Sequence, residues 1–399
     1  MLITALNCDL LPRALTFQEG TRSATNPIHW SMAYGPEEMS IGRAEHPNRE
    51  GATIVNRALI DAITKLTIDE TSRAHRIGIG QRIGAGQRVS EPMSIDFESN
   101  VFPLFHPAAV DDVKDPCPVF DGKLWHMFGS SGTVTSETWR ILHATAADLY
   151  GPWTEHGPIV LPVSGSGVAA PGVIHESGVF HMFIQTEFMK SGGRCEHAVS
   201  NDGFHWVLVS SAILALPGTD EDGIYDPHPA IIGGKRYIVY SGMPKFTKVP
   251  QPDVYLARSQ SDSWFGPWKR VGKILDHTEL PHHNPRQHPD YEWGIEGAQL
   301  VELPDARILL NATCFLPDGP RGSRQRVFFA IADRVEGPYR TFGPVLEPGE
   351  PGENGHSTVI IEGRKLTLFY QCRREGTNHR WRYGIAKCDL DGAVLSQVA

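Results

Sequence analysis

The sequence lacks any Cys-X-X-Cys pair, and its 6 cysteines are scattered over 399 residues. Zinc ribbons and thioredoxin-like redox motifs need closely spaced cysteines, so neither is indicated. We expect most of these cysteines to be buried as small apolar side chains. No apolar run is long enough to cross a bilayer, and the first residues lack the basic segment of a secretory signal. A cytoplasmic protein without a membrane partner is therefore expected.

Positive charge is scarce, with 37 Lys and Arg against 46 Asp and Glu, a net charge of -9 and a pI near 6.0. Such a chain has no general attraction for phosphate backbones, so no nucleic-acid partner is expected. Helical patterning is also scarce, because only residues 50–75 have a convincing helical pattern. The 40 Gly and 30 Pro indicate many turns. These features predict an all-β fold.

Five segments of the chain begin alike and start 55 to 70 residues apart: DPCPVF from Asp115, APGVIH from Ala170, DPHPAII from Asp226, EGAQLV from Glu296 and HSTVII from His356. About ten residues after each start comes a second strand rich in β-branched and aromatic residues. This spacing suits four-stranded blades. A β-sandwich also has many short strands, but it does not predict self-similar units of this length. We therefore predict a five-bladed β-propeller over residues 101–399.

Residues 1–100 do not fit the repeat. A helix is predicted near residues 53–68, where apolar residues from Ile54 to Leu66 recur at three- and four-residue steps. A basic, glycine-rich stretch follows from His75 and is a candidate for a strand that completes a blade. It contains GIGQRIG but lacks the strand, turn and helix that give a dinucleotide-binding motif its mechanism. We interpret residues 1–100 as a partly helical N-terminal extension.

The starts of the repeats predict a functional centre. The innermost strands of a propeller run side by side around its axis, so equivalent residues at their beginnings should meet at one mouth. These residues are Asp115, Ala170, Asp226, Glu296 and His356. Crowded carboxylates raise one another's pKa and cost stability, which a purely structural propeller would have no reason to bear. Asp-Pro alone is an ordinary turn start, but it occurs only twice in the chain, both times at this phase of the repeat.

The order of the blades predicts the roles of the carboxylates. Neighbouring third and fourth blades should bring Asp226 close to Glu296, whereas Asp115 should face Glu296 across the funnel. Inverting glycoside hydrolysis needs an acid and a base roughly 6.5–9.5 Å apart, with a water between them. We predict that Asp115 is the general base that activates water and that Glu296 is the protonated general acid. Asp226 would hold the proton on Glu296 by like-charge repulsion.

Other residues near the predicted mouth are candidates for binding the substrate, namely His356, Trp293, His228, Ala170 and Glu187. Trp293 lies three residues before Glu296, and aromatic faces suit the C–H-rich surfaces of sugars. His356 has two further candidate roles, tuning the acid or helping to hold a central hydrated cation such as Ca²⁺. No other cofactor is expected.

These residues resemble family 43 of the glycoside hydrolases, the five-bladed propellers that include arabinofuranosidases, arabinanases and xylosidases. The resemblance covers about residues 110–390 and is carried by KDP at Lys114–Pro116, AAP at Ala169–Pro171, YDP at Tyr225–Pro227, IEG at Ile295–Gly297 and GHS at Gly355–Ser357. In that family the first-blade Asp is the base, the third-blade Asp modulates the pKa of the acid, and the fourth-blade Glu is the acid. The resemblance implies α-L-arabinofuranosides, β-xylosides or related oligosaccharides as substrates.

The chain departs from the family pattern at Val168, where many members have a Trp. Two other functions are also open. A non-catalytic carbohydrate-binding propeller would keep the blades but would not need base, modulator and acid together. A glycoside phosphorylase would place cationic side chains for phosphate beside a single carboxylic acid. The sequence does not determine the sugar, its anomer, exo or endo action, or the oligomeric state, but its three carboxylates favour a hydrolase.

Overall fold

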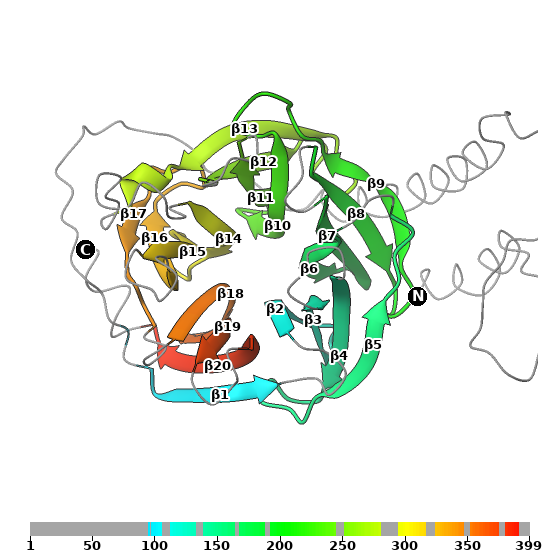
Figure 1. Cartoon of the computed structure of the whole chain (residues 1–399), viewed down its shortest axis with the longest axis vertical. Helices are drawn as coiled ribbons and strands as arrows, with labels where there is room; N and C mark the ends of the chain where they lie inside the picture. Colours follow the sequence, from blue (N-terminus) through cyan, green and yellow to red (C-terminus); the bar gives the residue numbers. More distant parts are fainter. Residues whose placement is uncertain are drawn as a thin grey trace, which may run out of the picture. The chain divides into compact units, whose positions relative to one another are not determined.

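The structure is a computed structural model that describes residues 95, 97–105, 112–132, 139–163, 167–187, 192–244, 251–280, 294–316, 324–346, 352–374 and 380–390. These residues form five four-stranded antiparallel sheets arranged around one axis (Figure 1). The predicted five-bladed propeller is confirmed. The helix predicted near 53–68 and the glycine-rich stretch from His75 lie outside the described residues.

Each of the first four blades is a meander of consecutive strands, with its first strand innermost (Figure 1). The first blade contains β2 (Asp112–Phe120), β3 (Trp125–Gly132), β4 (Arg140–Ala146) and β5 (Thr154–Ile159). The second contains β6 (Ala169–Glu176), β7 (Val179–Thr186), β8 (Arg194–Ser200) and β9 (Val207–Ile213). The third contains β10 (Gly223–Ile232), β11 (Lys235–Met243), β12 (Asp253–Ser259) and β13 (Trp268–Leu275). The fourth contains β14 (Ile295–Glu302), β15 (Ile308–Leu316), β16 (Arg324–Ala332) and β17 (Arg340–Phe342).

The fifth blade closes the ring with strands from both ends of the propeller. It contains β18 (Gly352–Glu362), β19 (Lys365–Arg374) and β20 (Arg382–Asp389), and its outer strand is β1 (Ser99–Phe105). In Figure 1 the cyan β1 lies beside the red β20, with which it pairs antiparallel. The blade-completing strand therefore begins at Ser99 rather than in the stretch from His75, and the boundary predicted at residue 100 falls inside it.

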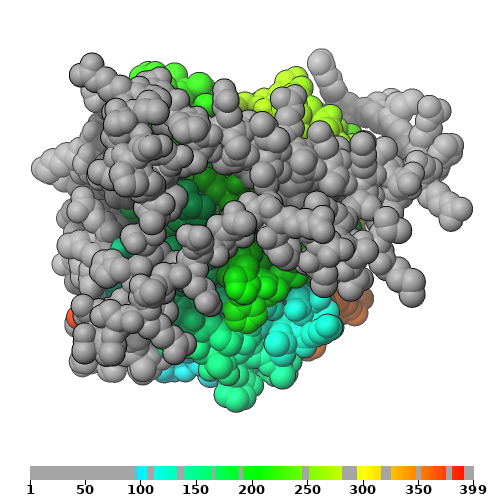
Figure 2. All heavy atoms as spheres, turned by 90° about the vertical axis from the view of Figure 1, so that its right-hand side faces the viewer, coloured from blue at the N-terminus to red at the C-terminus, as the bar shows by residue number. Residues whose placement is uncertain are grey.

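The middle strands of the blades are buried on both faces, whereas the outer strands are half exposed. All six interior residues of β7 are buried, and exposure alternates along β5. Such alternation is expected for a strand with one face on the core and one in solvent. Figure 2 presents the side of the molecule that carries the first two blades. The described residues include one short 3-10 helix, His277–Glu279, and no helix long and apolar enough to span a membrane.

The apolar core is divided into clusters that lie between neighbouring blades. One pair of large side chains from each junction illustrates this, namely Phe128 with Phe180, Phe183 with Tyr240, Leu256 with Leu310, Phe329 with Leu368, and Met127 with Tyr383. Each blade thus buries one face against each neighbour, so no blade can bury its apolar surface alone. The described cysteines are buried free thiols, as predicted, namely Cys117, Cys195, Cys314, Cys372 and Cys388.

The inner strands of the second and third blades approach each other closely at Gly172. A Cβ atom at this position would lie 2.2 Å from the Pro227 carbonyl oxygen and 2.7 Å from the His228 Cα of the neighbouring blade. Since both are backbone atoms, we expect Gly172→Ala to lower the free energy of unfolding by about 1–3 kcal/mol, measured by urea denaturation. Gly178, in a hairpin turn with nothing within 4 Å of such a Cβ, provides the control. Gly178→Asn should cost less, and an equal loss in both variants would contradict this packing.

Candidate active site

A β-bulge at the same place in every blade presents the residues of the predicted centre. Pairing of the first two strands is interrupted after Lys114, Ala169, Tyr225, Glu296 and Gly355. The residue that follows has a positive φ in each blade: Asp115 at 56°, Ala170 at 49°, Asp226 at 49°, Gly297 at 59° and His356 at 31°. The bulge therefore turns each of these residues out of the regular ladder at the axis.

The fourth blade corrects the predicted equivalence of the five residues. Its bulge residue is Gly297, and Glu296 stays in the ladder opposite Thr313, one position earlier than Asp115 in the first blade. A left-handed backbone costs glycine little, whereas the other described blades place larger residues there. Glu296 therefore reaches the centre from a regular strand position.

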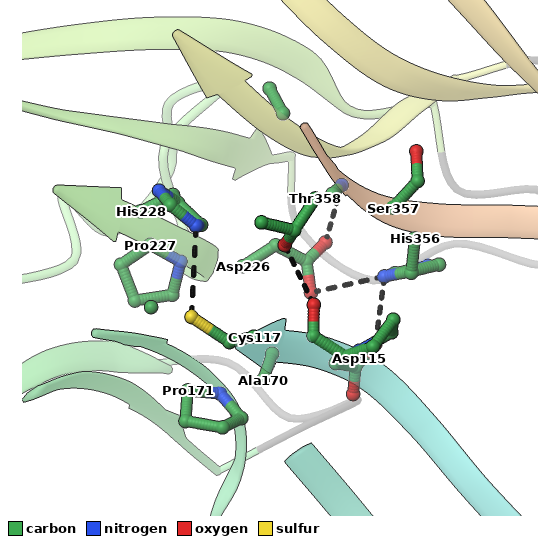
Figure 3. Close-up of a pocket in the computed structure, with 14 residues that line it drawn as sticks. Asp115, Cys117, Ala170, Pro171, Asp226, Pro227, His228, His356, Ser357 and Thr358 are labelled. Carbon is green, nitrogen blue, oxygen red and sulfur yellow. Dashed lines mark hydrogen bonds and ion pairs between the residues drawn. The ribbon is translucent and has the colours of Figure 1, made fainter. Parts of the chain in front are cut away.

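His356 lies between the predicted carboxylates. Its Nδ1 is 2.8 Å from Asp115 Oδ1 and 3.9 Å from Asp226 Oδ1, and its Nε2 is 3.3 Å from Glu296 Oε2. Figure 3 shows Asp115, Asp226 and His356 pointing toward one another from three strands. The structure thus brings all three predicted catalytic residues to one imidazole ring, although their catalytic roles remain a prediction.

The site is partly withdrawn from solvent. The side chains of His356, Asp226 and Asp115 are 7%, 9% and 13% exposed, and that of Glu296 is 20% exposed. A cavity of about 30 Å³ lies against Asp115, Asp226 and His356, with room for about one or two water molecules. Glu296 is thus the most accessible of the three carboxylates.

The pKa values of the groups around the imidazole differ, because burial and neighbouring charges act on each to a different extent. Burial alone would raise the pKa of Asp115, but the nearby His356, with Lys114 and Ser130, lowers it to about 2. Burial raises the pKa of Asp226 to about 6; Glu296 and Asp115 add to this shift and His356 opposes it. Burial opposes protonation of His356, yet Asp115 and Asp226 raise its pKa to about 10. At neutral pH, Asp115 is therefore ionised and His356 is protonated.

The predicted substrate-binding residues are distributed differently. Ala170 and His228 line the cavity together with Asp115 and Asp226. Glu187 follows β7 and is not part of the cavity lining; its backbone carbonyl accepts a 3.5 Å hydrogen bond from the Tyr225 hydroxyl. Trp293 lies outside the described residues. Roles of these residues in substrate binding remain predictions.

Sequence reasoning missed the thiol of Cys117 at this site. Its Sγ lies 3.9 Å from His228 Nε2 and 3.7 Å from the Val173 carbonyl oxygen, and Cys117 is two residues further along β2 than Asp115 (Figure 3). Burial raises the pKa of Cys117 to about 12, so it is a thiol rather than a thiolate. A scattered cysteine carries no signal of such a position, because only the fold brings it beside His228.

Lys114 was also missed as a feature of the mouth. Its Nζ lies 5.7 Å from the ring centre of Trp139 and 5.9 Å from that of Trp381, so two aromatic rings of neighbouring blades hold this cation beside Asp115. The Lys-Asp-Pro motif marked the position, but the two tryptophans lie far from it in the sequence. Both rings are almost fully buried.

Three residues of the site are suited to hold a metal ion. Asp115, Asp226 and His356 each offer a ligand atom, and these atoms lie within 4.8 Å of one another. Ca²⁺ takes roughly six to eight oxygen ligands, so water would have to complete its shell here. The two carboxylates suit such a hydrated cation, whereas the His356 nitrogen could bind one only after losing its proton.

Comparison with protein-family models finds no match for this sequence, and comparison with curated proteins finds none either. Solved structures do match. An exo-1,5-α-L-arabinanase from a bovine ruminal metagenomic library is 16% identical with a TM-score of 0.52, covering 70% of this chain and 94% of its own. The α-L-arabinanase of Cellvibrio cellulosa is 15% identical with a TM-score of 0.52, covering 69% of this chain and 91% of its own.

A thermostable family-43 glycoside hydrolase matches with a TM-score of 0.54 at 14% identity, covering 74% of this chain and 91% of its own. The chain has the fold of the family 43 propellers. The resemblance found in the five repeat starts is thereby confirmed for the architecture. At these identities the likeness concerns the fold, and the chemistry must be argued from the site.

The charge of His356 predicts how stability depends on pH. Its folded pKa of about 10 exceeds the ordinary 6.5, so its contribution to stability is complete below pH 6.5 and is lost as pH rises to about 10. We expect His356→Gln to be less stable than the wild type at pH 6.5, with a smaller difference at pH 10, measured by urea unfolding.

His205 provides the control, since its side chain is 91% exposed. His205→Gln should change stability little at either pH. A deficit of His356→Gln that is the same at pH 6.5 and pH 10 would show that the imidazole does not carry a charge in the folded protein.

Proposed function

We propose that this protein is a glycoside hydrolase that cleaves O-glycosidic bonds with inversion, acting on α-L-arabinofuranosides, β-xylosides or related oligosaccharides. One observation carries the proposal: carboxylates from the first, third and fourth blades surround one imidazole of the fifth at the propeller axis. Pairs of titratable groups whose pKa values are driven apart are typical of acid and base roles in catalysis. Here the pKa of Asp115, the proposed base, is lowered to about 2, and that of Asp226, the proposed modulator beside the acid, is raised to about 6.

Asp115 is the proposed general base. The protonated His356 beside it keeps the carboxylate ionised at neutral pH, so it can accept a proton from water. It also lines the cavity of about 30 Å³, which is of the size that water occupies. As Asp115 takes this proton, the oxygen of that water forms a bond to the anomeric carbon.

Glu296 is the proposed general acid, because it is the most exposed of the three carboxylates and can reach a leaving oxygen. Its proton passes to that oxygen as the glycosidic C–O bond breaks. Asp226 supports this step through the backbone, since its Oδ2 accepts a 3.1 Å hydrogen bond from the amide of Gly297, the residue after Glu296. Asp226 is the proposed modulator of this acid, and His356 Nε2, 3.3 Å from Glu296 Oε2, would act on the same carboxyl group.

Inversion is proposed because Asp115 and Glu296 contact different nitrogens of one ring, with His356 Nδ1 2.8 Å from Asp115 Oδ1 and Nε2 3.3 Å from Glu296 Oε2. Inverting enzymes hold acid and base roughly 6.5–9.5 Å apart with a water between them, and a ring between the two carboxylates is compatible with that spacing. Bond cleavage then leaves Asp115 protonated and Glu296 ionised, and exchange with solvent restores both.

The cavity of about 30 Å³ is far too small for a sugar ring, so the substrate would bind outside it, next to Glu296 and within reach of the cavity water. His356 and Ala170, which line the cavity, would contact the substrate, and Trp293 stays a candidate for stacking on a sugar ring. Glu187 would act from the rim, and His228 from deeper along the axis. A hydrated cation such as Ca²⁺, if bound to Asp115, Asp226 and a deprotonated His356, would neutralise the negative charge in place of the imidazolium.

The proposed roles predict different responses to the leaving group. Protonation matters most for a poor leaving group such as a sugar alkoxide, whereas water activation is needed in every case. Glu296→Ala should lose roughly 100- to 10,000-fold in kcat/KM on an arabino- or xylo-oligosaccharide but much less on a dinitrophenyl glycoside. Asp115→Ala should lose activity on both. Sugar release by the purified protein is the measurement, after a screen of α-L-arabinofuranosides and β-D-xylosides.

Glu302, at the far end of the same strand, provides the control, and Glu302→Ala should retain activity on both substrates. NMR of the first-formed sugar should reveal inverted configuration at the anomeric carbon. Equal losses for Glu296→Ala on both leaving groups would remove it from the acid role, and retained configuration would make Asp115 a nucleophile. Carbohydrate binding without any turnover would instead identify a binding propeller.

A further inference from the structure

The second strand of every blade carries a buried polar residue at one repeated position. Each of these residues pairs with the residue that precedes the bulge of its own blade. All are between 0% and 3% exposed: Ser130, Gln185, Ser241, Thr313 and Gln371. Buried polar side chains need hydrogen-bond partners, and five of them at one position of the repeat indicate a common structural role.

In four blades this side chain accepts the backbone N–H of the bulge residue in the next blade. The distances are 2.7 Å from Ala170 N to Ser130 Oγ, 2.9 Å from Asp226 N to Gln185 Oε1, 2.5 Å from His356 N to Thr313 Oγ1, and 3.0 Å from Asp115 N to Gln371 Oε1. An amide inside a bulge is excluded from the strand ladder, so it must find an acceptor elsewhere. The neighbouring blade supplies that acceptor each time.

The junction between the third and fourth blades completes the ring in a different way. The amide of Gly297 donates to Asp226 Oδ2 at 3.1 Å, and the Ser241 hydroxyl donates to the same oxygen at 3.4 Å. Asp226 thus takes the place that the second-strand side chain has elsewhere. Every bulge amide around the axis is held by a side chain that comes from the preceding blade.

Three of the amides held in this way belong to residues of the proposed active site. Asp115, Asp226 and His356 have a left-handed backbone without being glycine, a conformation that persists only where the surroundings enforce it. A bulge that relaxed would swing its side chain away from the axis. The direction of each functional side chain therefore depends on an acceptor in the neighbouring blade.

We propose that Gln371, Gln185 and Thr313 are positioning residues, which hold Asp115, Asp226 and His356 in place through their backbone amides. None of the three is required to touch the substrate. The bonds also join successive blades, so assembly of the ring and alignment of the site are one event. The effect on catalysis rests on the glycosidase function proposed above, whereas the effect on the amides does not.

Thr313 allows the sharpest test, because Thr313→Val keeps the shape of the side chain and removes the acceptor, whereas Thr313→Ser keeps the hydroxyl. In Thr313→Val we expect hydrogen exchange at the amide of His356 to accelerate about tenfold. We expect kcat to fall about 100-fold with little change in KM, as for a misplaced catalytic group. Thr313→Ser should restore both values close to the wild type.

Thr367→Val is the matched control, since Thr367 is a buried hydroxyl residue of a second strand whose ladder partners lie beyond the bulge. It should leave exchange at His356 and kcat unchanged. The proposal is overturned if Thr313→Val leaves exchange at His356 unchanged, if Thr313→Ser loses as much as Thr313→Val, or if Thr367→Val matches the loss. If the wild type hydrolyses no glycoside, the proposed function fails, and the exchange measurement alone decides for or against the positioning role.

Discussion

The imidazole of His356 holds together a centre that would otherwise repel itself. Three carboxylates meet at the propeller axis, and in a partly desolvated site they cannot all be ionised without a compensating charge. Contacts of 2.8 Å to Asp115 and 3.3 Å to Glu296, with Asp226 Oδ1 at 3.9 Å, place one ring among all three. The low pKa of Asp115, and with it the proposed role of Asp115 as the base, depends on the charge of that ring.

A β-bulge repeated in every blade orients Asp115, Asp226 and His356. This bulge lies near the start of each inner strand and turns one residue toward the axis, and apolar clusters between the blades set the distances between the strands. The ring of amide acceptors then links each bulge to the preceding blade. Carboxylates from three blades lie around one imidazole, so a shift of any of these blades would change the electrostatic interactions of all the others with His356.

Sequence reasoning was most successful where the repeat itself carried the information. The five starts identified the inner strands, and the phase of Asp115, Asp226, Glu296 and His356 predicted that they converge. The prediction that Glu296 is equivalent to Asp115 was wrong. The left-handed residue of the fourth blade is Gly297, one position later, and aligning Glu-Gly with Asp-Pro hides this offset. The glycine in that pair was the available signal for a left-handed bulge.

Features that depend on contacts between distant segments could not be predicted from the sequence. The contact of Cys117 with His228 joins different blades, and the rings of Trp139 and Trp381 reach Lys114 from segments far from it in the sequence, so no local pattern connects these residues. Gln185 and Gln371 belong to no sequence motif. Their role becomes visible only in the structure, where each accepts a hydrogen bond from a bulge amide of the next blade. The closing strand was predicted in the stretch from His75 but is β1, because the sequence does not show which segment before the first blade pairs with β20.

Nitrogen NMR of the His356 side chain, in protein dialysed against EDTA and held at pH 7, tests the central claim most directly. The signal can be assigned by its loss in His356→Gln. The account predicts that both ring nitrogens carry a proton, one facing Asp115 and one facing Glu296. A ring with one nitrogen unprotonated at pH 7 would contradict it, because a neutral imidazole could not hold three carboxylates together or keep Asp115 ionised beside them.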